Sequence, residues 1–163
     1  MGIDPGTATT GFCILEEKSG NKVAAVEYGC IRTSKNESAH KRLSQIHEGL
    51  RSLLLKHKPN EVAVEKLFFN KNVKTAMSVS QARGVILLAA SQAGLDVAEY
   101  TPLEVKMALT GYGRADKNQV QQMVKILLNL KTIPKPDDAA DALAVALCHI
   151  STNKFNSKVK NAK

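Results

Sequence analysis

Residues 1–15 read MGIDPGTATTGFCIL, and this stretch decides the fold. Two short apolar runs, residues 1–4 and 10–15, are separated by Pro5 and Gly6, a pair that favours a turn. The polar residues 16–22 form a further turn, and residues 23–32 place β-branched side chains among apolar ones. The beginning of the chain therefore predicts three short strands, the first of which ends at Asp4.

The rest of the chain alternates between helical and strand-like patterns. Helices are predicted over residues 38–56, 72–94, 102–111, the segment after Asp116 and about 137–150; strands are predicted over 61–67 and 95–100. Asp116 and Gln119 form a capping-box pattern at the start of their helix. This order predicts an α/β fold, with a mixed sheet flanked by helices. We expect residues 1–150 to form one domain and residues 151–163 a flexible basic tail.

Composition restricts the partners and the compartment. The chain has 163 residues, a net charge of +8 and a pI near 9.5, which favours a polyanionic partner. Half of the excess charge comes from lysines near the C-terminus, so charge alone does not establish nucleic-acid binding: Lys154, Lys158, Lys160 and Lys163. No apolar run approaches the roughly 18 residues that span a bilayer, and no secretory signal is evident. We therefore expect a cytoplasmic protein.

The three cysteines are isolated from one another. Cys13, Cys30 and Cys148 are widely spaced and lie among apolar residues. An odd number at such spacing argues against a disulfide framework and against a zinc site. Free, buried thiols are the expected state.

Four carboxylates stand out because acids are scarce in this chain. Only 15 acidic residues occur, yet Asp4 ends an apolar strand and Glu65 lies near the end of another. Asp138 and Asp141 share one face of an otherwise almost wholly apolar helix. Carboxylates at strand ends can converge on one site, and a set of oxygen ligands without His or Cys selects Mg²⁺ or Mn²⁺.

Each acid also has a structural interpretation. An Asp before Pro-Gly is common turn chemistry, and acids in the first turn of a helix commonly cap it. Asp137 and Asp141 would share a helix face as well as Asp138 and Asp141 do, although Asp137 is better placed as the N-cap. The residues alone leave this pairing open. The four acids together favour a metal site, because burying several negative charges without cations is costly.

The sequence resembles the RuvC-type Holliday-junction resolvases of the ribonuclease H-like superfamily. The matching residues extend over nearly all of residues 1–150: Gly2-Ile3-Asp4-Pro5-Gly6, Thr10-Gly11, Gly29-Cys30-Ile31-Arg32-Thr33, Glu65, Phe68, Lys71-Asn72, Gln81-Ala82-Arg83-Gly84-Val85, Lys117, Gln119-Val120-Gln121, Met123-Val124 and Asp138-Ala139-Ala140-Asp141-Ala142-Leu143. The resemblance implies a ribonuclease H-like mixed sheet of about five strands. Only Met1 and Gly2 precede Ile3, so we expect a short first strand.

The resemblance also implies roles for individual residues. Asp4, Glu65, Asp138 and Asp141 would bind two Mg²⁺ ions, for which Mn²⁺ could substitute, and Asp138 rather than Asp137 matches the motif. The remaining expected DNA contacts are a base-stacking aromatic residue, two active-site lysines and three further phosphate contacts: Phe68, Lys106, Lys117, Lys71, Lys74 and Arg114.

The expected activity is the resolution of four-way junctions by paired nicks. Because such a junction has approximate twofold symmetry, we expect a homodimer, with residues 72–94 contributing to its interface. The RuvA–RuvB branch-migration complex is the expected protein partner. The alternatives are a related nuclease acting on structured RNA and a non-catalytic junction-binding module. An actin-like ATPase would need two domains and a far longer chain.

Overall fold

A computed structural model describes residues 1–66 and 73–161, except for the side chains of residues 21, 73–75 and 157–161. Its elements in chain order are β1 (Gly2–Asp4), β2 (Thr9–Lys18), the 3₁₀ turn η1 (Ser19–Asn21), β3 (Lys22–Arg32), α1 (Ala39–His57), β4 (Val62–Glu65), α2 (Val73–Gln92), β5 (Val97–Tyr100), α3 (Pro102–Thr110), α4 (Lys117–Leu127) and α5 (Asp137–Asn161). No helix in these described ranges is long and apolar enough to cross a membrane.

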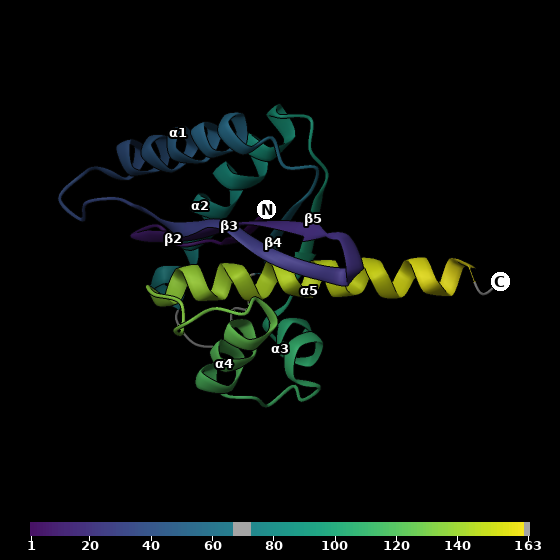
Figure 1. The fold of residues 1–163 in the computed structure, drawn as a ribbon. Helices are drawn as coiled ribbons and strands as arrows, with labels where there is room; N and C mark the ends of the chain where they lie inside the picture. Colours follow the sequence, from purple (N-terminus) through teal and green to yellow (C-terminus); the bar gives the residue numbers. More distant parts are fainter. Residues whose placement is uncertain (67–72, 162–163) are drawn as a thin grey trace.

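The five strands form one mixed sheet in the order β3-β2-β1-β4-β5. The pairs β1–β2 and β2–β3 are antiparallel, whereas β4 runs parallel to β1 and β5 parallel to β4. Helices α1 and α2 cover one face, and α5 crosses the other with α3 and α4 beneath it (Figure 1). The predicted α/β class and the expected strand number are confirmed, and the first strand is only three residues long.

Each face of the sheet has its own hydrophobic core. On the α1–α2 side, fully buried Ile3 and Val64 pack with Ile46 of α1 and Ile86 of α2. On the other side, Leu143 and its neighbours in α5 pack with the apolar stripe of α4. Both cores close over β1, which holds this central strand and Asp4 at its end in a fixed position.

Two strand glycines allow α5 to lie directly on the sheet. A Cβ atom on Gly11 would come within 2.5 Å of the carbonyl carbon of Asp138, and one on Gly2 within 2.7 Å of the Cβ of Ala146. Real Cβ atoms essentially never approach other atoms within 3.0 Å. The absent side chains of these glycines therefore set how closely the first half of α5 approaches β1 and β2.

The hairpin between β2 and β3 is longer than predicted. Residues 16–18 were expected in a turn, but pairing continues to Lys18 opposite Lys22. The turn is the three residues of η1, where Gly20 has a φ of 75°, a conformation that glycine adopts without strain. Polar side chains did not prevent strand formation here, because this end of the hairpin is solvent-exposed and the backbone pairing is satisfied.

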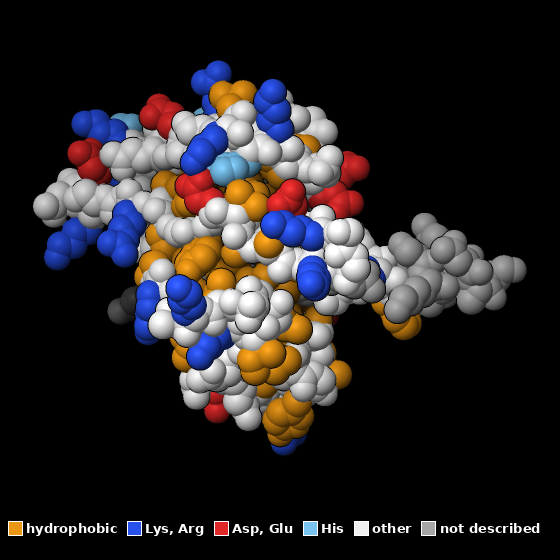
Figure 2. Space-filling model, in the orientation of Figure 1, with side chains coloured by type: hydrophobic (Ala, Val, Ile, Leu, Met, Phe, Trp, Pro, Cys, Tyr) orange, Lys and Arg blue, Asp and Glu red, His pale blue; other side chains and the backbone are white. Residues whose placement is uncertain are grey.

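Basic side chains are widely distributed on the surface. Figure 2 shows Lys and Arg side chains over several elements of one face, without a single basic stripe. On this face, charge therefore does not by itself mark a path for a polyanion. Cys13 and Cys148 are buried, Cys30 is half-buried, and all three are free, as expected.

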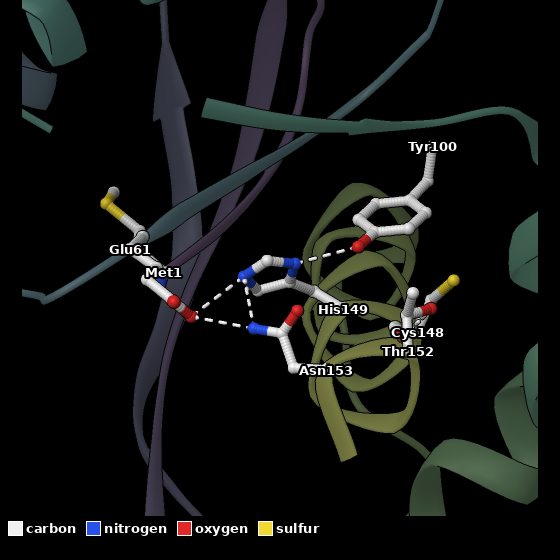
Figure 3. A network of polar contacts seen from close by, with 7 residues as sticks. All are labelled: Met1, Glu61, Tyr100, Cys148, His149, Thr152 and Asn153. Atoms are coloured by element: carbon white, nitrogen blue, oxygen red, sulfur yellow. Dashed lines mark hydrogen bonds and ion pairs between the residues drawn. The ribbon is translucent and has the colours of Figure 1, made fainter. Parts of the chain in front are cut away.

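Helix α5 continues eleven residues beyond Ile150, the predicted end of this helix, whereas the flexibility expected of residues 151–163 stays a prediction. Figure 3 shows polar contacts of this part of α5: the ring of His149 lies between Tyr100 and Glu61, at 2.8 Å from the Tyr100 hydroxyl and 2.9 Å from Glu61 Oε2. Asn153 Nδ2 donates to the same Glu61 oxygen at 3.1 Å. These contacts bind the second half of α5 to Glu61, which precedes β4, and to Tyr100, the last residue of β5.

Candidate active site

The four carboxylates singled out in the sequence come from neighbouring elements. Asp4 is the last residue of β1, and Glu65 is the last residue of β4, the parallel strand beside it. Asp138 and Asp141 lie in the first turns of α5. The register places Asp4 opposite Gly11, the residue against which the backbone of Asp138 packs. The fold thus brings three distant stretches of sequence together at the end of the sheet where β1 and β4 terminate.

The electrostatics of Asp4 show how closely these acids approach one another. Burial raises the pKa of Asp4 well above its usual value, and the charges of Glu65, Asp141 and Asp138 raise it further. A hydrogen bond between Asp4 and Glu65 contributes to the raised pKa of Asp4. Asp4 therefore lies within the field of all three other acids.

The pKa values of Glu65 and Asp141 are raised as well. Burial raises the pKa of Glu65, and the charge of Asp141 adds to this effect. Burial likewise raises the pKa of Asp141, although Lys117 acts in the opposite direction. A cluster in which three carboxyl groups are discouraged from ionising gains stability from a bound cation.

The chemistry of this cluster fits a hard divalent ion. All four side chains are oxygen donors, the ligands that Mg²⁺ and Mn²⁺ prefer. As the side chains stand, no group of three or more acidic, His or Cys residues in the described parts of the chain is already arranged around a common ion position. Asp4 and Glu65 instead share a hydrogen bond, and an ion that binds both carboxylates would replace the proton of that bond.

Lys117 is the cation that faces the cluster. Its ammonium nitrogen lies 3.0 Å from Asp141 Oδ2 and 3.3 Å from Asp137 Oδ2. Burial lowers the pKa of Lys117, but the bonds to Asp141 and Asp137 outweigh burial and raise it. The predicted capping box is present: Asp116 accepts from the backbone N–H of Gln119, whose side chain accepts from that of Asp116. This cap fixes the first turn of α4, from which Lys117 projects.

A cavity of about 190 Å³ lies beside the carboxylates. Its polar lining consists of Glu65, Asp141, Lys106 and Lys117, and its apolar lining comes from α3, α4 and α5. The structure thus brings Lys106 and Lys117, both predicted from the sequence, to the same cavity as two of the acids. A group bound there would meet negative and positive side chains together.

Among the other predicted DNA contacts, Arg114 is the one whose side chain the structure describes, and it does not line this cavity. Arg114 is exposed in the loop between α3 and α4. Phe68 and Lys71 lie outside the described residues, as does the side chain of Lys74. Their contacts with DNA stay predictions.

Sequence reasoning missed the role of Asp137. The expected position of this residue was the N-cap, but it is the first residue of α5 and forms an ion pair with Lys117. The available signal was its four-residue spacing from Asp141, which places both acids on one helix face. That spacing could not indicate Lys117 as the shared partner, because Lys117 belongs to another helix.

Comparisons with known proteins agree with this fold. Residues 1–149 match the family described as crossover junction endodeoxyribonuclease RuvC. The enzyme of that name from Halothermothrix orenii is 56% identical over 158 residues, which cover 97% of this chain and 95% of the relative. That from Moorella thermoacetica is 56% identical over 160 residues, covering 98% and 95% respectively. The structure of Thermus thermophilus RuvC in complex with a Holliday junction substrate superimposes with a TM-score of 0.89 at 38% identity, covering 95% of this chain and 94% of that one.

The fold is therefore that of the ribonuclease H-like nucleases, as the sequence resemblance implied. Within that class, the chain belongs to the RuvC family of crossover junction endodeoxyribonucleases.

Proposed function

We propose that this chain resolves Holliday junctions by nicking DNA strands, at a site where Asp4, Glu65, Asp138 and Asp141 bind two Mg²⁺ ions. The observation that carries the proposal is that these four acids lie close together where β1 and β4 end. The family to which the chain belongs consists of metal-dependent endodeoxyribonucleases. The related Thermus thermophilus enzyme was seen with a Holliday junction substrate, which supports the same substrate here.

The residues at the site have distinct tasks in this reaction. Asp4 lies in the field of the other three acids and would hold the ions together with them. When bound, the ions would activate a water molecule and stabilise the leaving 3′ oxygen, giving a 5′-phosphate and a 3′-hydroxyl. Lys117 would neutralise charge that develops on the scissile phosphate, with support from Lys106 in the same cavity. Mn²⁺, which has similar ligand preferences, should replace Mg²⁺.

We propose a homodimer as the active form, because two identical sites related by a twofold axis match the symmetry of a four-way junction. Exposed apolar side chains on α2, including Met77 at 72% and Leu88 at 52%, support a role for this helix in the interface. Static light scattering at micromolar concentration should give the mass of two chains. A monomer with full junction-cutting activity would refute the dimer. The RuvA–RuvB complex as partner remains a proposal from the resemblance. The cytoplasm as location and residues 1–150 as the domain remain proposals from the sequence.

The deciding experiment uses a synthetic mobile four-way junction with each strand labelled in turn. In Mg²⁺ we expect paired, symmetric nicks, whereas Ca²⁺ should permit binding without cleavage. A linear duplex and a structured RNA of equal length serve as competitors. Preferential cutting of the RNA would favour the nuclease alternative, and junction binding without nicks in Mg²⁺ or Mn²⁺ would favour a non-catalytic binding module.

A further inference from the structure

Two carboxylates from the first turns of α5 hold Lys117, and only Asp141 belongs to the proposed metal ligands. The Lys117 ammonium lies 3.0 Å from Asp141 Oδ2 and 3.3 Å from Asp137 Oδ2. Asp141 and Asp137 are four residues apart and project from the same side of the helix. The lysine therefore spans a proposed metal ligand and an acid that has no assigned role.

The carboxylate of Asp137 is held in a defined orientation. Its Oδ1 accepts a hydrogen bond from Gln121 Nε2 at 3.2 Å, and its Oδ2 faces Lys117. Gln121 is 8% exposed, so α4 fixes the position of its amide. Lys117 and Gln121 are also four residues apart, and they contact the two oxygens of Asp137 from one face of α4. Lys135 lies 3.5 Å from Oδ1 with a highly exposed side chain, so its contact adds little.

Asp141 has two uses that conflict. An Asp141 carboxylate that binds a divalent ion is a weaker partner for Lys117, because the two cations repel each other at short range. The side chain of Lys117 is 53% exposed and has a flexible four-carbon stem. With Asp141 as its only partner, Lys117 would either compete with the ion or move into solvent.

We propose that Asp137 is a positioning residue that keeps Lys117 beside the cleavage site when Asp141 binds metal. Lys117 then moves from two carboxylate partners to one without leaving the cavity. Asp137 contacts neither the phosphate nor the metal in this scheme. The inference rests on the proposed function, since it gives Lys117 the task of meeting the scissile phosphate.

A double-mutant cycle tests whether Asp137 acts through Lys117. Single-turnover junction cleavage in saturating Mg²⁺ is measured for wild type, Asp137→Asn, Lys117→Ala and the double variant. We expect Lys117→Ala to slow cleavage about 100-fold and Asp137→Asn about two- to fivefold. Asp137→Asn should cause no further loss in the Lys117→Ala background. Asp137→Glu, which keeps the charge, should restore part of the rate, and Lys135→Ala should leave it unchanged.

A second measurement does not depend on cleavage. Calorimetric titration of the DNA-free protein with Ca²⁺ should show weaker binding for Asp137→Asn, because Lys117 is left with Asp141 as its only partner. The effect should disappear in the Lys117→Ala background. An equal effect of Asp137→Asn in both backgrounds would overturn the proposal, since it would reflect only the lost negative charge; wild-type behaviour of Asp137→Asn would also overturn it.

The proposed function and the proposed role of Asp137 can be refuted separately. If wild type does not nick junctions, the proposed function fails, while the Ca²⁺ titration still decides whether Asp137 and Lys117 act as a pair. If Lys117→Ala cleaves at the wild-type rate, the role of Lys117 and the inference about Asp137 fail together, and the junction nuclease stands.

Discussion

Replacing Gly11 with alanine adds one methyl group at the point where α5 rests on β2. Gly11 does not have a positive φ, so alanine suits its backbone conformation and the effect is purely steric. The new Cβ would stand 2.5 Å from the carbonyl carbon of Asp138 and 3.2 Å from the nitrogen of Ala139. Both atoms are backbone, so no side chain can rotate out of the way.

The size of the effect follows from this geometry. Ordinary contact begins at 3.4 Å, and the Asp138 carbonyl oxygen would lie even closer to the new Cβ than the carbonyl carbon does, so the backbone at Asp138 must retreat by at least 3.4 − 2.5 = 0.9 Å. A displacement of about 1 Å in a catalytic group can reduce the rate about 100-fold. Overpacking of this kind typically costs about 1–3 kcal/mol of folding free energy. We expect Gly11→Ala to remain folded but to lose about 99% of its junction-cutting rate.

Single-turnover cleavage and thermal unfolding should be measured together. Gly29→Ala is a matched control, because Gly29 lies in the adjacent strand β3 and its Cβ would meet the ring of Phe12 at an ordinary 3.4 Å. This control should keep its activity. A wild-type cleavage rate for Gly11→Ala would refute the steric effect proposed for this position. An equal loss of activity in Gly29→Ala would refute it as well.

Three further variants test other parts of the structure. Asp138→Asn should reduce junction cleavage in Mg²⁺ by at least about 100-fold while junction binding in Ca²⁺ persists, and a wild-type rate would remove Asp138 from the site. Asp4→Asn should abolish cleavage yet raise the stability of the metal-free protein at neutral pH by about 1 kcal/mol, measured by unfolding in EDTA. Because the pKa of Asp4 is raised on folding, its ionised form opposes folding at neutral pH, and metal-free wild type should gain stability as pH falls from that raised pKa towards 3.8. Asp4→Asn should show a smaller gain, which comes from the raised pKa values of Glu65 and Asp141. His149→Ala removes the hydrogen bonds to Tyr100 and Glu61 and should lower stability by about 1–2 kcal/mol in urea unfolding, whereas an unchanged midpoint would show that the network does not anchor α5.

Much of the fold and the site could be predicted because the signals were local. Pro5-Gly6 ends β1, and the alternation around Val62 and Val64 predicts β4, so Asp4 and Glu65 were expected at strand ends. The Asp116–Gln119 pattern correctly predicted the start of α4. Each of these features depends on residues within one turn or one strand.

Features that depend on distant partners could not be predicted in this way. Residues 151–161 are polar and basic, which by composition resembles a solvated tail, but His149 and Asn153 find Glu61 about ninety positions earlier in the chain. The ion pair between Lys117 and Asp137 likewise joins two helices whose crossing is set by the packed core. The importance of Gly11 arises from the backbone of α5, which no neighbouring residue in the sequence indicates.

The length of α5 between its two attachments is under a constraint of its own. Gly11 fixes the helix at Asp138, and Glu61 fixes it at His149, eleven positions later. One inserted residue between them would advance the helix by about 1.5 Å and rotate it by about 100°. Either the acids or the histidine would then face away from its partners. We therefore expect homologues to vary in length at the exposed turn η1, where a Cβ on Gly20 would have no neighbour within 4 Å. We expect no insertions or deletions between residues 141 and 149.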